Sequence, residues 1–282
     1  MEFVTFHTAL GSDQFVHPNE TLKHREYLSM IDMMFSSARL FYPGAKTTIL
    51  TNHNSNFDDI SQRSEIVRFD TDASKLMLGR AIAQLDYVQN NLNENPMILV
   101  DSDILLNASL SPVFKSDFDV AVTWRLNEKM PINGGFIILN NVRPEVSLNF
   151  FTRFVAIYQQ NYFDEAAWFG DQLALRDAIG INLHDYGENS IVDVEGCRIL
   201  LLPCDVYNFS PRNQYSEINS NLSEKIVLHF KGERKRLMNH FWKAWLKPRN
   251  SFAPWVLFDA WRERRWLQQQ ANDEMLDIST KR

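Results

Sequence analysis

Strand-like and helix-like segments alternate along most of this chain of 282 residues. Short apolar or β-branched runs predict strands, and between them apolar residues recur at helical spacing. The predicted strands are 3–6, 47–51, 66–69, 97–100, 120–123, 136–139, 199–202 and 226–229, and the predicted helices are 19–41, 75–89, 145–160 and 170–178. This alternation predicts an α/β sheet with helices on both faces. From about Arg236 the chain is predicted to be mainly helical, with a break at Pro248 and Pro254.

The run Met97–Val100 is apolar throughout, which is typical of a strand buried on both faces of a sheet. Asp101-Ser102-Asp103 follows it directly. In open α/β sheets the ligand crevice lies outside the carboxyl ends of the strands. Carboxylates two residues apart in extended chain point to the same side, so Asp101 and Asp103 can hold a divalent cation that bridges phosphate oxygens. The alternative is that Asp103 caps a turn and Asp101 is solvated at the strand end.

The segment His229–Lys235 follows the last predicted strand. His229 can supply a third metal ligand, Gly232 allows the backbone to approach a phosphate, and Lys235 carries a positive charge for it. A surface histidine in a solvated basic turn is the alternative. Because both Asp residues and His229 end apolar strands of one expected sheet, we predict that the three converge within coordination range.

Two further motifs stand next to predicted elements. Asn133-Gly134-Gly135 precedes the predicted strand 136–139. The glycines indicate a tight turn or a backbone close to a ligand that Asn133 can hydrogen-bond, and a plain β-turn explains them nearly as well. Asp171 and Gln172 stand at a predicted helix start, where they either face a substrate or, for Asp171, cap the helix.

Charge is unevenly distributed along the chain. The net charge of −6 argues against a general nucleic-acid binder. Residues 231–265 carry a net charge of +7, which leaves −13 for the rest. In or beside this stretch lie five of the seven tryptophans, Trp242, Trp245, Trp255, Trp261 and Trp266. The C-terminal end is therefore predicted to present a different kind of surface from the body.

In their order along the chain, these motifs resemble those of the GT-A glycosyltransferases, most closely family 8, which includes glycogenin and the lipopolysaccharide galactosyltransferases. That family has a nucleotide site at the first strand, a basic residue on the helix before the metal motif, and Asp-x-Asp. An Asn-small-Gly strand start, an Asp-Gln helix start and His-x-x-Gly-x-x-Lys follow. The matching positions here are Thr8, Arg80, Asp101, Asp103, Asn133, Gly134, Gly135, Asp171, Gln172, His229, Gly232 and Lys235. The resemblance covers roughly residues 1–240.

The resemblance implies a GT-A (Rossmann-like) mixed sheet in residues 1–235, to which we add a basic, Trp-rich helical extension in residues 236–282. It implies a hexosyltransferase-like enzyme that moves a sugar from a nucleotide diphosphate, expected to be a UDP-sugar, to a saccharide or lipid-linked acceptor with retention. Asp101, Asp103 and His229 would hold Mn²⁺ or Mg²⁺. Donor binding would fall to Thr8, Arg80, Ser102, Gly134, Gly135, Gly232 and Lys235, and catalytic contacts with the sugar to Asn133, Asp171 and Gln172. If the enzyme is instead inverting, Asp171 is the candidate general base.

Two other functions stay open. Phosphohydrolases of the haloacid dehalogenase type also carry Asp-x-Asp after an apolar strand, with the first Asp as nucleophile. Their motif normally opens the chain, whereas a hundred residues precede Asp101 here, and no later Asp-Asp pair completes their metal site. The second alternative is a non-catalytic GT-A-like binding protein, against which the full set of candidate ligands argues.

The sequence also bears on location. No apolar run reaches the roughly 18–20 residues of a membrane helix, and the start of the chain lacks the pattern of a signal peptide. Cys197 and Cys204 cannot make a disulfide framework, which favours a reducing compartment. We therefore expect a cytoplasmic protein. Its Trp-rich basic end either packs onto the body or touches the inner face of a membrane, as a peripheral contact.

Overall fold

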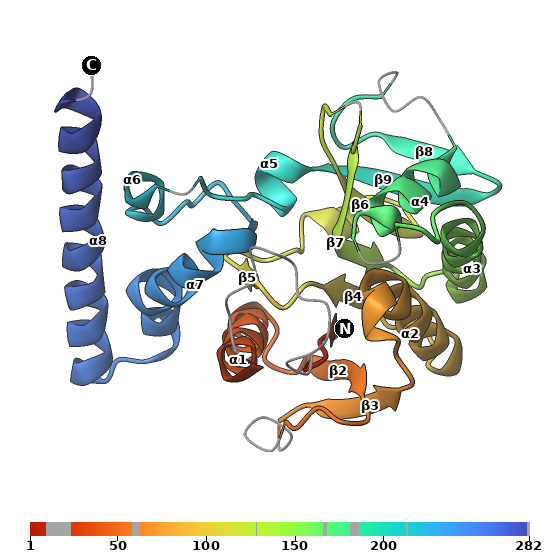
Figure 1. Cartoon of the computed structure of the whole chain (residues 1–282), viewed down its shortest axis with the longest axis horizontal. Coiled ribbons are helices and arrows are strands. Elements are labelled where there is room, and N and C mark those ends of the chain that lie inside the picture. The colour runs from red at the N-terminus through yellow and green to blue at the C-terminus, as the bar shows by residue number, and fades with distance from the viewer. Residues whose placement is uncertain are drawn as a thin grey trace.

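An eight-stranded mixed sheet forms the centre of the molecule (Figure 1). The structure is a computed structural model that describes residues 1–9, 24–57, 63–127, 129–165, 168–180, 186–212 and 214–280. In spatial order the strands are β3 (Glu65–Phe69), β2 (Lys46–Asn52), β1 (Glu2–Phe6), β4 (Met97–Val100), β7 (Ile132–Leu139), β6 (Val120–Trp124), β9 (Cys197–Pro203) and β8 (Ile191–Val194). The first four run parallel, whereas β7 is antiparallel to both of its neighbours. The carboxyl ends of β1 and β4 therefore lie at the same edge of the sheet.

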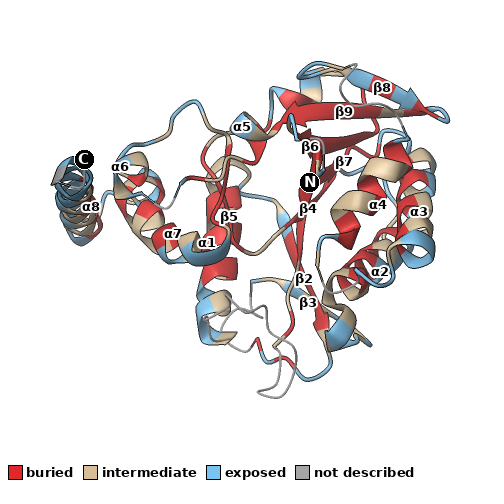
Figure 2. Cartoon of the chain, turned by 45° about the horizontal axis from the view of Figure 1, so that its top comes forward, coloured by how far each residue is buried: buried red, intermediate tan, exposed pale blue. Residues whose placement is uncertain are grey.

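Helices cover both faces of this sheet, as the alternation of elements predicts (Figure 2). One face carries α1 (His24–Phe41) and α7 (Lys235–Phe241), and the other carries α2 (Leu76–Asn90), α3 (Pro144–Asn161) and α4 (Gly170–Ile179). Successive residues of a strand point to opposite faces. In β4, Ile98 accordingly belongs to the apolar cluster on the α1 side and Leu99 to the cluster on the α3 side. All four residues of β4 are buried, which is what their apolar run predicts.

A second, two-stranded sheet lies outside the main one. It pairs β5 (Ile104–Leu106) with β10 (Val227–His229) in antiparallel register. Two short helices, α5 (Cys204–Tyr207) and α6 (Tyr215–Ile218), lie between β9 and β10 in the chain. Because only three residues separate the end of β4 from the start of β5, the Asp-Ser-Asp segment is the connection between the two sheets.

The C-terminal end forms an arm at the side of the body. After α7 come a π-helical turn, Trp242–Leu246, and a 3₁₀ turn that ends at Asn250, and α8 (Pro254–Thr280) then runs as one long helix apart from the main sheet (Figure 1). The helix starts at a proline because its missing N–H needs no partner in a first turn. Among the described residues, no helix combines the length and the apolarity needed to cross a membrane.

All eight strands and the four helices predicted for the body occur, within a few residues at their ends. The predicted start of the first helix, residues 19–23, lies outside the described residues. Two strands were not predicted, β5 and β8, which are three and four residues long. β5 follows the Asp-Ser-Asp segment directly, and an aspartate interrupts the apolar run of β8, so neither shows the continuous four-residue apolar run that predicts β4. Both cysteines are free thiols, as the sequence predicts.

Candidate functional site

Two carboxylates and one imidazole meet just beyond the carboxyl end of β4. Nε2 of His229 lies 3.0 Å from Oδ1 of Asp103 and 3.6 Å from Oδ2 of Asp101. One ligand atom from each of the three residues lies within 4.8 Å of the other two. The predicted convergence of these side chains is therefore confirmed. Within the described part of the chain, no other group of three acidic, histidine or cysteine side chains is arranged in this way.

The sheet that carries His229 differs from the prediction. We expected all three residues at the ends of strands in one sheet, which is wrong, since His229 belongs to the two-stranded sheet. The β5–β10 register sets His229 opposite Ile104, the residue after Asp103. The backbone N–H of Phe230 also donates to the carbonyl oxygen of Asp103 at 2.9 Å. A short apolar strand looks the same in sequence whichever sheet it joins, so the pattern did not distinguish the two.

The side chain of His229 is almost fully buried, with 4% of its surface exposed. Burial lowers the pKa of His229, and the nearby Lys231 adds to this effect. Its Nδ1 lies 2.8 Å from Oδ1 of Asn208, a residue that sequence analysis did not single out. A neutral imidazole whose Nε2 faces two carboxylates places three electron-pair donors around one point. The donor set, two carboxylate oxygens and one imidazole nitrogen, fits a divalent cation there.

Arg80 from α2 links the metal ligands to the start of α4. Its Nη1 donates to Oδ1 of Asp101, and its Nη2 donates to Oδ2 of Asp171 at 2.6 Å. The Arg80 and Asp171 side chains are 9% and 4% exposed, so this ion pair is held away from water. Burial raises the pKa of Asp171, against the opposing charge of Arg80. Asp171 does not cap α4, whose N-cap is Phe169, but points from the first turn into the protein.

The two glycines lie inside β7, where all eight residues are buried, so the β-turn interpretation of this motif is wrong. They are needed because acidic side chains pass directly over the strand. A Cβ on Gly134 would stand 2.6 Å from Oδ2 of Asp171, and a Cβ on Gly135 would stand 2.5 Å from both Oδ2 of Asp101 and Cε1 of His229. Glycine in a strand interior often marks such a close approach.

Replacing Gly135 by Ala is expected to weaken Mn²⁺ binding by about 10- to 100-fold, because the added methyl group must push Asp101 and His229 apart. Titration calorimetry with MnCl₂ measures the change. Gly44→Ala is the matched control, since a Cβ there meets nothing within 4 Å. Equal Mn²⁺ affinity in the two variants would contradict the expectation.

Asn133 and Gln172 lie next to each other beside this cluster. The Asn133 Nδ2 group donates weakly to Oε1 of Gln172 at 3.4 Å, and the Asn133 Oδ1 atom accepts from the Gly135 backbone at 3.1 Å. The structure thus brings the Asn-Gly-Gly motif of β7 and the Asp-Gln motif of α4 to one place. Oδ1 of Asp171 and Nε of Arg80 are both buried, and among the described residues neither has a hydrogen-bond partner.

Aromatic rings gather at the carboxyl end of β1. His7 stacks on Tyr27 and His24, with ring centroids 4.7 Å and 5.3 Å away. Burial and the neighbouring His24 lower the pKa of His7 to about 3, so it is neutral at physiological pH. Lys235 Nζ donates to the Tyr27 hydroxyl at 2.8 Å, which connects the start of α7 to this group.

The remaining predicted donor residues lie in nearby connections. Thr8 follows His7 and is buried, with its Oγ1 lacking a hydrogen-bond partner among the described residues. Ser102 lies in the turn between the two aspartates. Gly232 has a φ of +58°, a left-handed conformation that favours glycine, just before α7 begins.

No family model matches the sequence, and no curated protein is similar to it in sequence. Solved structures nonetheless share its fold. The glycosyltransferase GlyE of Streptococcus pneumoniae TIGR4 matches 93% of this chain at 13% identity, with a TM-score of 0.53. The galactosyltransferase LgtC, solved with donor and acceptor sugar analogs, matches 92% at 10% identity, with a TM-score of 0.51. A glycosyltransferase involved in glycosylation of the major capsid of PBCV-1 matches 85% at 10% identity, with a TM-score of 0.50.

The chain spans 63% of the length of GlyE, 100% of LgtC and 97% of the PBCV-1 enzyme. At such low identity the likeness shows the fold. The mixed sheet with helices on both faces is therefore the GT-A fold, as the sequence motifs imply, and a long C-terminal helix follows it.

Proposed function

We propose that this chain is a metal-dependent glycosyltransferase that moves a sugar from a nucleotide diphosphate, specifically a UDP-sugar, to an acceptor hydroxyl with retention of configuration. The observation that carries the proposal is the convergence of Asp101, Asp103 and His229 on a GT-A sheet. His229 comes from a segment more than a hundred residues after Asp101 and Asp103, and its buried imidazole lies beside both carboxylates.

Asp101, Asp103 and His229 would hold the cation, and their mixed oxygen and nitrogen donors favour Mn²⁺ over Mg²⁺. When bound, the cation neutralises the negative charge that builds on the distal phosphate as the glycosidic bond breaks. Lys235 adds a second positive charge on the same side. Thr8, two residues after the end of β1, would meet the base and ribose.

The residues of β7 and α4 would form the sugar side of the pocket. The partnerless Oδ1 of Asp171 and Nε of Arg80 supply an acceptor and a donor for sugar hydroxyls, because buried polar atoms of this kind are costly when left unpaired. Asn133 and Gln172 add two amides beside them. Retention needs no free carboxylate base in this arrangement, and the ion pair with Arg80 makes Asp171 a poor one.

The GT-A fold disfavours the haloacid dehalogenase alternative. The fold does not distinguish an enzyme from a non-catalytic binding protein, because one fold can carry sites of different chemistry. A protein that binds UDP-sugars with Mn²⁺ but neither transfers nor hydrolyses them would be such a binding module.

The proposal is tested by calorimetry with UDP-sugars in the presence and absence of Mn²⁺. Affinity is expected to require the metal and to fall by about 1.5–3 kcal/mol in Lys235→Ala, as for a lost charge-assisted contact. Lys115→Ala, an exposed lysine on a surface turn, is the control. Metal-independent binding, or unchanged affinity in Lys235→Ala, would count against the proposed donor site.

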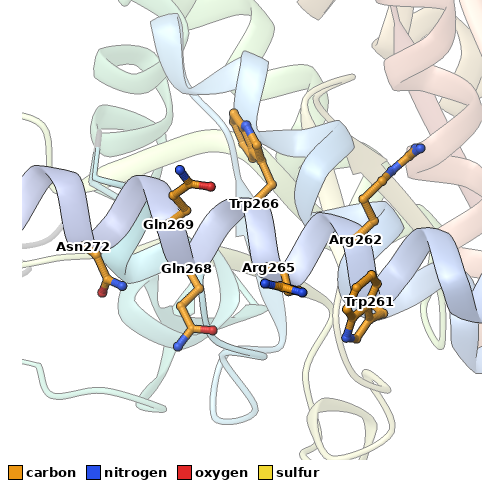
Figure 3. Close-up of a pocket in the computed structure, with 7 residues that line it drawn as sticks. All are labelled: Trp261, Arg262, Arg265, Trp266, Gln268, Gln269 and Asn272. Carbon is orange, nitrogen blue, oxygen red and sulfur yellow. The ribbon is translucent and has the colours of Figure 1, made fainter.

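The acceptor is proposed to be lipid-linked, and the enzyme to be a cytoplasmic protein that touches the membrane through its C-terminal arm. Trp242, Trp245 and Trp266 pack partly buried against the α1-side core. Trp255 and Trp261 are instead 71% and 51% exposed. Figure 3 shows Trp261 and Trp266 projecting to opposite sides of α8, with Arg265 beside Trp261. Exposed tryptophan with arginine suits an anionic membrane surface, where each basic side chain adds about 1 kcal/mol.

The full-length chain is expected to bind vesicles that contain anionic lipids, with an affinity that falls as salt rises, because the basic residues are screened. A Trp255→Ser/Trp261→Ser variant should lose most of this binding in a sedimentation assay. Neutral vesicles are the control. If the full-length chain ignores anionic vesicles at low salt, the acceptor is soluble and the arm is structural.

A further inference from the structure

We propose that Asn208 is a positioning residue for the metal site. Its side-chain oxygen Oδ1 accepts a hydrogen bond from Nδ1–H of His229, and this leaves the lone pair of Nε2 facing Asp101 and Asp103. The inference rests on the proposed function, because it assigns this residue to the same metal centre. Asn208 follows α5, belongs to none of the sequence motifs, and is 2% exposed.

A backbone N–H can only donate, so the N–H of Gly135 fixes the orientation of the side chain that it contacts. The N–H of Gly135 lies 3.1 Å from Oδ1 of Asn133, so this side-chain atom must be the carbonyl oxygen rather than the amide nitrogen. Oδ1 of Asn133 also lies 2.8 Å from a terminal atom of the Asn208 side chain. Since two carbonyl oxygens cannot hydrogen-bond to each other, that atom of Asn208 is its Nδ2.

Thr123 gives the same orientation independently. The Thr123 hydroxyl donates its one proton to the backbone carbonyl oxygen of Asn133 at 3.0 Å. The hydroxyl oxygen can then only accept from Nδ2 of Asn208, which lies 2.8 Å away. Both N–H groups of the Asn208 amide therefore have partners, and its Oδ1 atom points the other way.

That Oδ1 atom lies 2.8 Å from Nδ1 of His229. A carbonyl oxygen only accepts, so Nδ1 must carry a proton. In a neutral imidazole the lone pair then belongs to Nε2, the atom that faces the two carboxylates. A histidine that ligates a metal commonly donates its other ring N–H to such a partner, which fixes the ring orientation.

The backbone keeps Asn208 and His229 in register. The residue after Asn208, Phe209, forms a bridge with Leu228, and the backbone N–H of His229 donates to the Phe209 carbonyl oxygen at 2.8 Å. The side chain therefore acts on His229 from a segment that is hydrogen-bonded to β10. Through Asn133 the same network reaches Gln172, so the proposed sugar and metal sides share one hydrogen-bonded unit.

The test measures binding of Mn²⁺ alone to the full chain by calorimetry. Asn208→Leu removes the acceptor for Nδ1–H at similar volume and is expected to weaken Mn²⁺ binding about 10- to 100-fold, as for other partners of ligating histidines. Asn208→Asp keeps an acceptor for that proton but sets a carboxylate oxygen against Oδ1 of Asn133, so its Mn²⁺ affinity is expected to lie between those of Asn208→Leu and the wild type. This rescue would not occur if Asn208 served only to pack the interior.

Asn140→Leu is the matched control for losing a buried asparagine. Asn140 is also buried, and its Nδ2 donates a hydrogen bond to the backbone carbonyl oxygen of Phe118 at 2.9 Å. It follows the carboxyl end of β7, whereas Asn133 lies near the start of that strand. Its replacement should leave Mn²⁺ affinity unchanged.

A second readout needs no metal. The proton NMR spectrum should show an exchange-protected Nδ1–H of His229 in wild type and in Asn208→Asp. This signal should be lost in Asn208→Leu.

A folded Asn208→Leu variant with wild-type Mn²⁺ affinity would overturn the positioning role while leaving the metal site intact, and so would an Asn208→Asp variant as weak as Asn208→Leu. Wild-type protein that binds no Mn²⁺, yet shows the protected Nδ1–H signal, would instead overturn the proposed metal site itself and the positioning role with it.

Discussion

Replacing Asp103 by Asn is expected to lower metal-dependent sugar transfer by about a thousand-fold or more. The substitution keeps the shape of the side chain but removes a negative charge that lies 3.0 Å from Nε2 of His229. Loss of the metal's stabilisation of the leaving phosphate is worth several kcal/mol, and each 1.36 kcal/mol corresponds to about a factor of ten in rate. The measurement is kcat/KM for UDP-sugar turnover at fixed Mn²⁺.

Asp117→Asn is the control for this substitution. The Asp117 side chain is 76% exposed and pairs with Arg198, before the start of β6. Its replacement removes the same charge from the protein without touching the cluster, so turnover should stay at the wild-type level. Transfer that survives in Asp103→Asn at the rate of this control would refute the assignment of Asp103 as a ligand.

Replacing Arg80 by Met is expected to lower the free energy of unfolding by about 3–5 kcal/mol, because the change leaves the Asp171 carboxylate buried without its cation. Urea denaturation of the wild type and the variant measures the difference. Burial already raises the pKa of Asp171, and the loss of Arg80 removes the charge that opposes this shift. A raised pKa in the folded state favours the protonated form, so the difference in stability should shrink as the pH falls.

The double variant Arg80→Met/Asp171→Asn separates this cause from lost packing. It removes the buried charge together with its partner, so it should recover a large part of the stability lost in the single variant. If the double variant is as unstable as Arg80→Met, the loss comes from the Arg80 side chain filling space and not from an unpaired carboxylate at Asp171.

The sequence allowed prediction of those parts of the site that local pattern encodes. A continuous apolar run followed by Asp-Ser-Asp predicts a buried strand with carboxylates at its end, and both occur. The glycines before Phe136 marked a close approach of some kind, but the atoms that approach are those of Asp101, His229 and Asp171, from three other segments. Those partners depend on tertiary packing, which no local pattern records.

Asn208 and Arg80 illustrate what a single sequence cannot show. Asn208 follows a four-residue helix and has no neighbouring motif, so only its hydrogen bonds to Asn133 and His229 identify it. Arg80 was predicted to contact the donor, and its pairing with both Asp101 and Asp171 depends on how α2 packs against α4 and the sheet. Contacts between residues far apart in the chain depend on the assembled fold. The hydrophobic periodicity that predicts strands and helices is instead visible within about ten residues.

The pairing of β5 with β10 joins segments that are more than a hundred residues apart in the chain. Closing so long a loop lowers the conformational entropy of the chain before the strand contacts form. This pairing is therefore expected late in folding. Asp101 and Asp103 would then lie at the end of an already formed strand before His229 joins them. A cation that binds only the completed cluster would stabilise the finished fold in proportion to its concentration. The metal would in this way hold together two strands that close a loop of more than a hundred residues, and its removal should first speed the opening of β10.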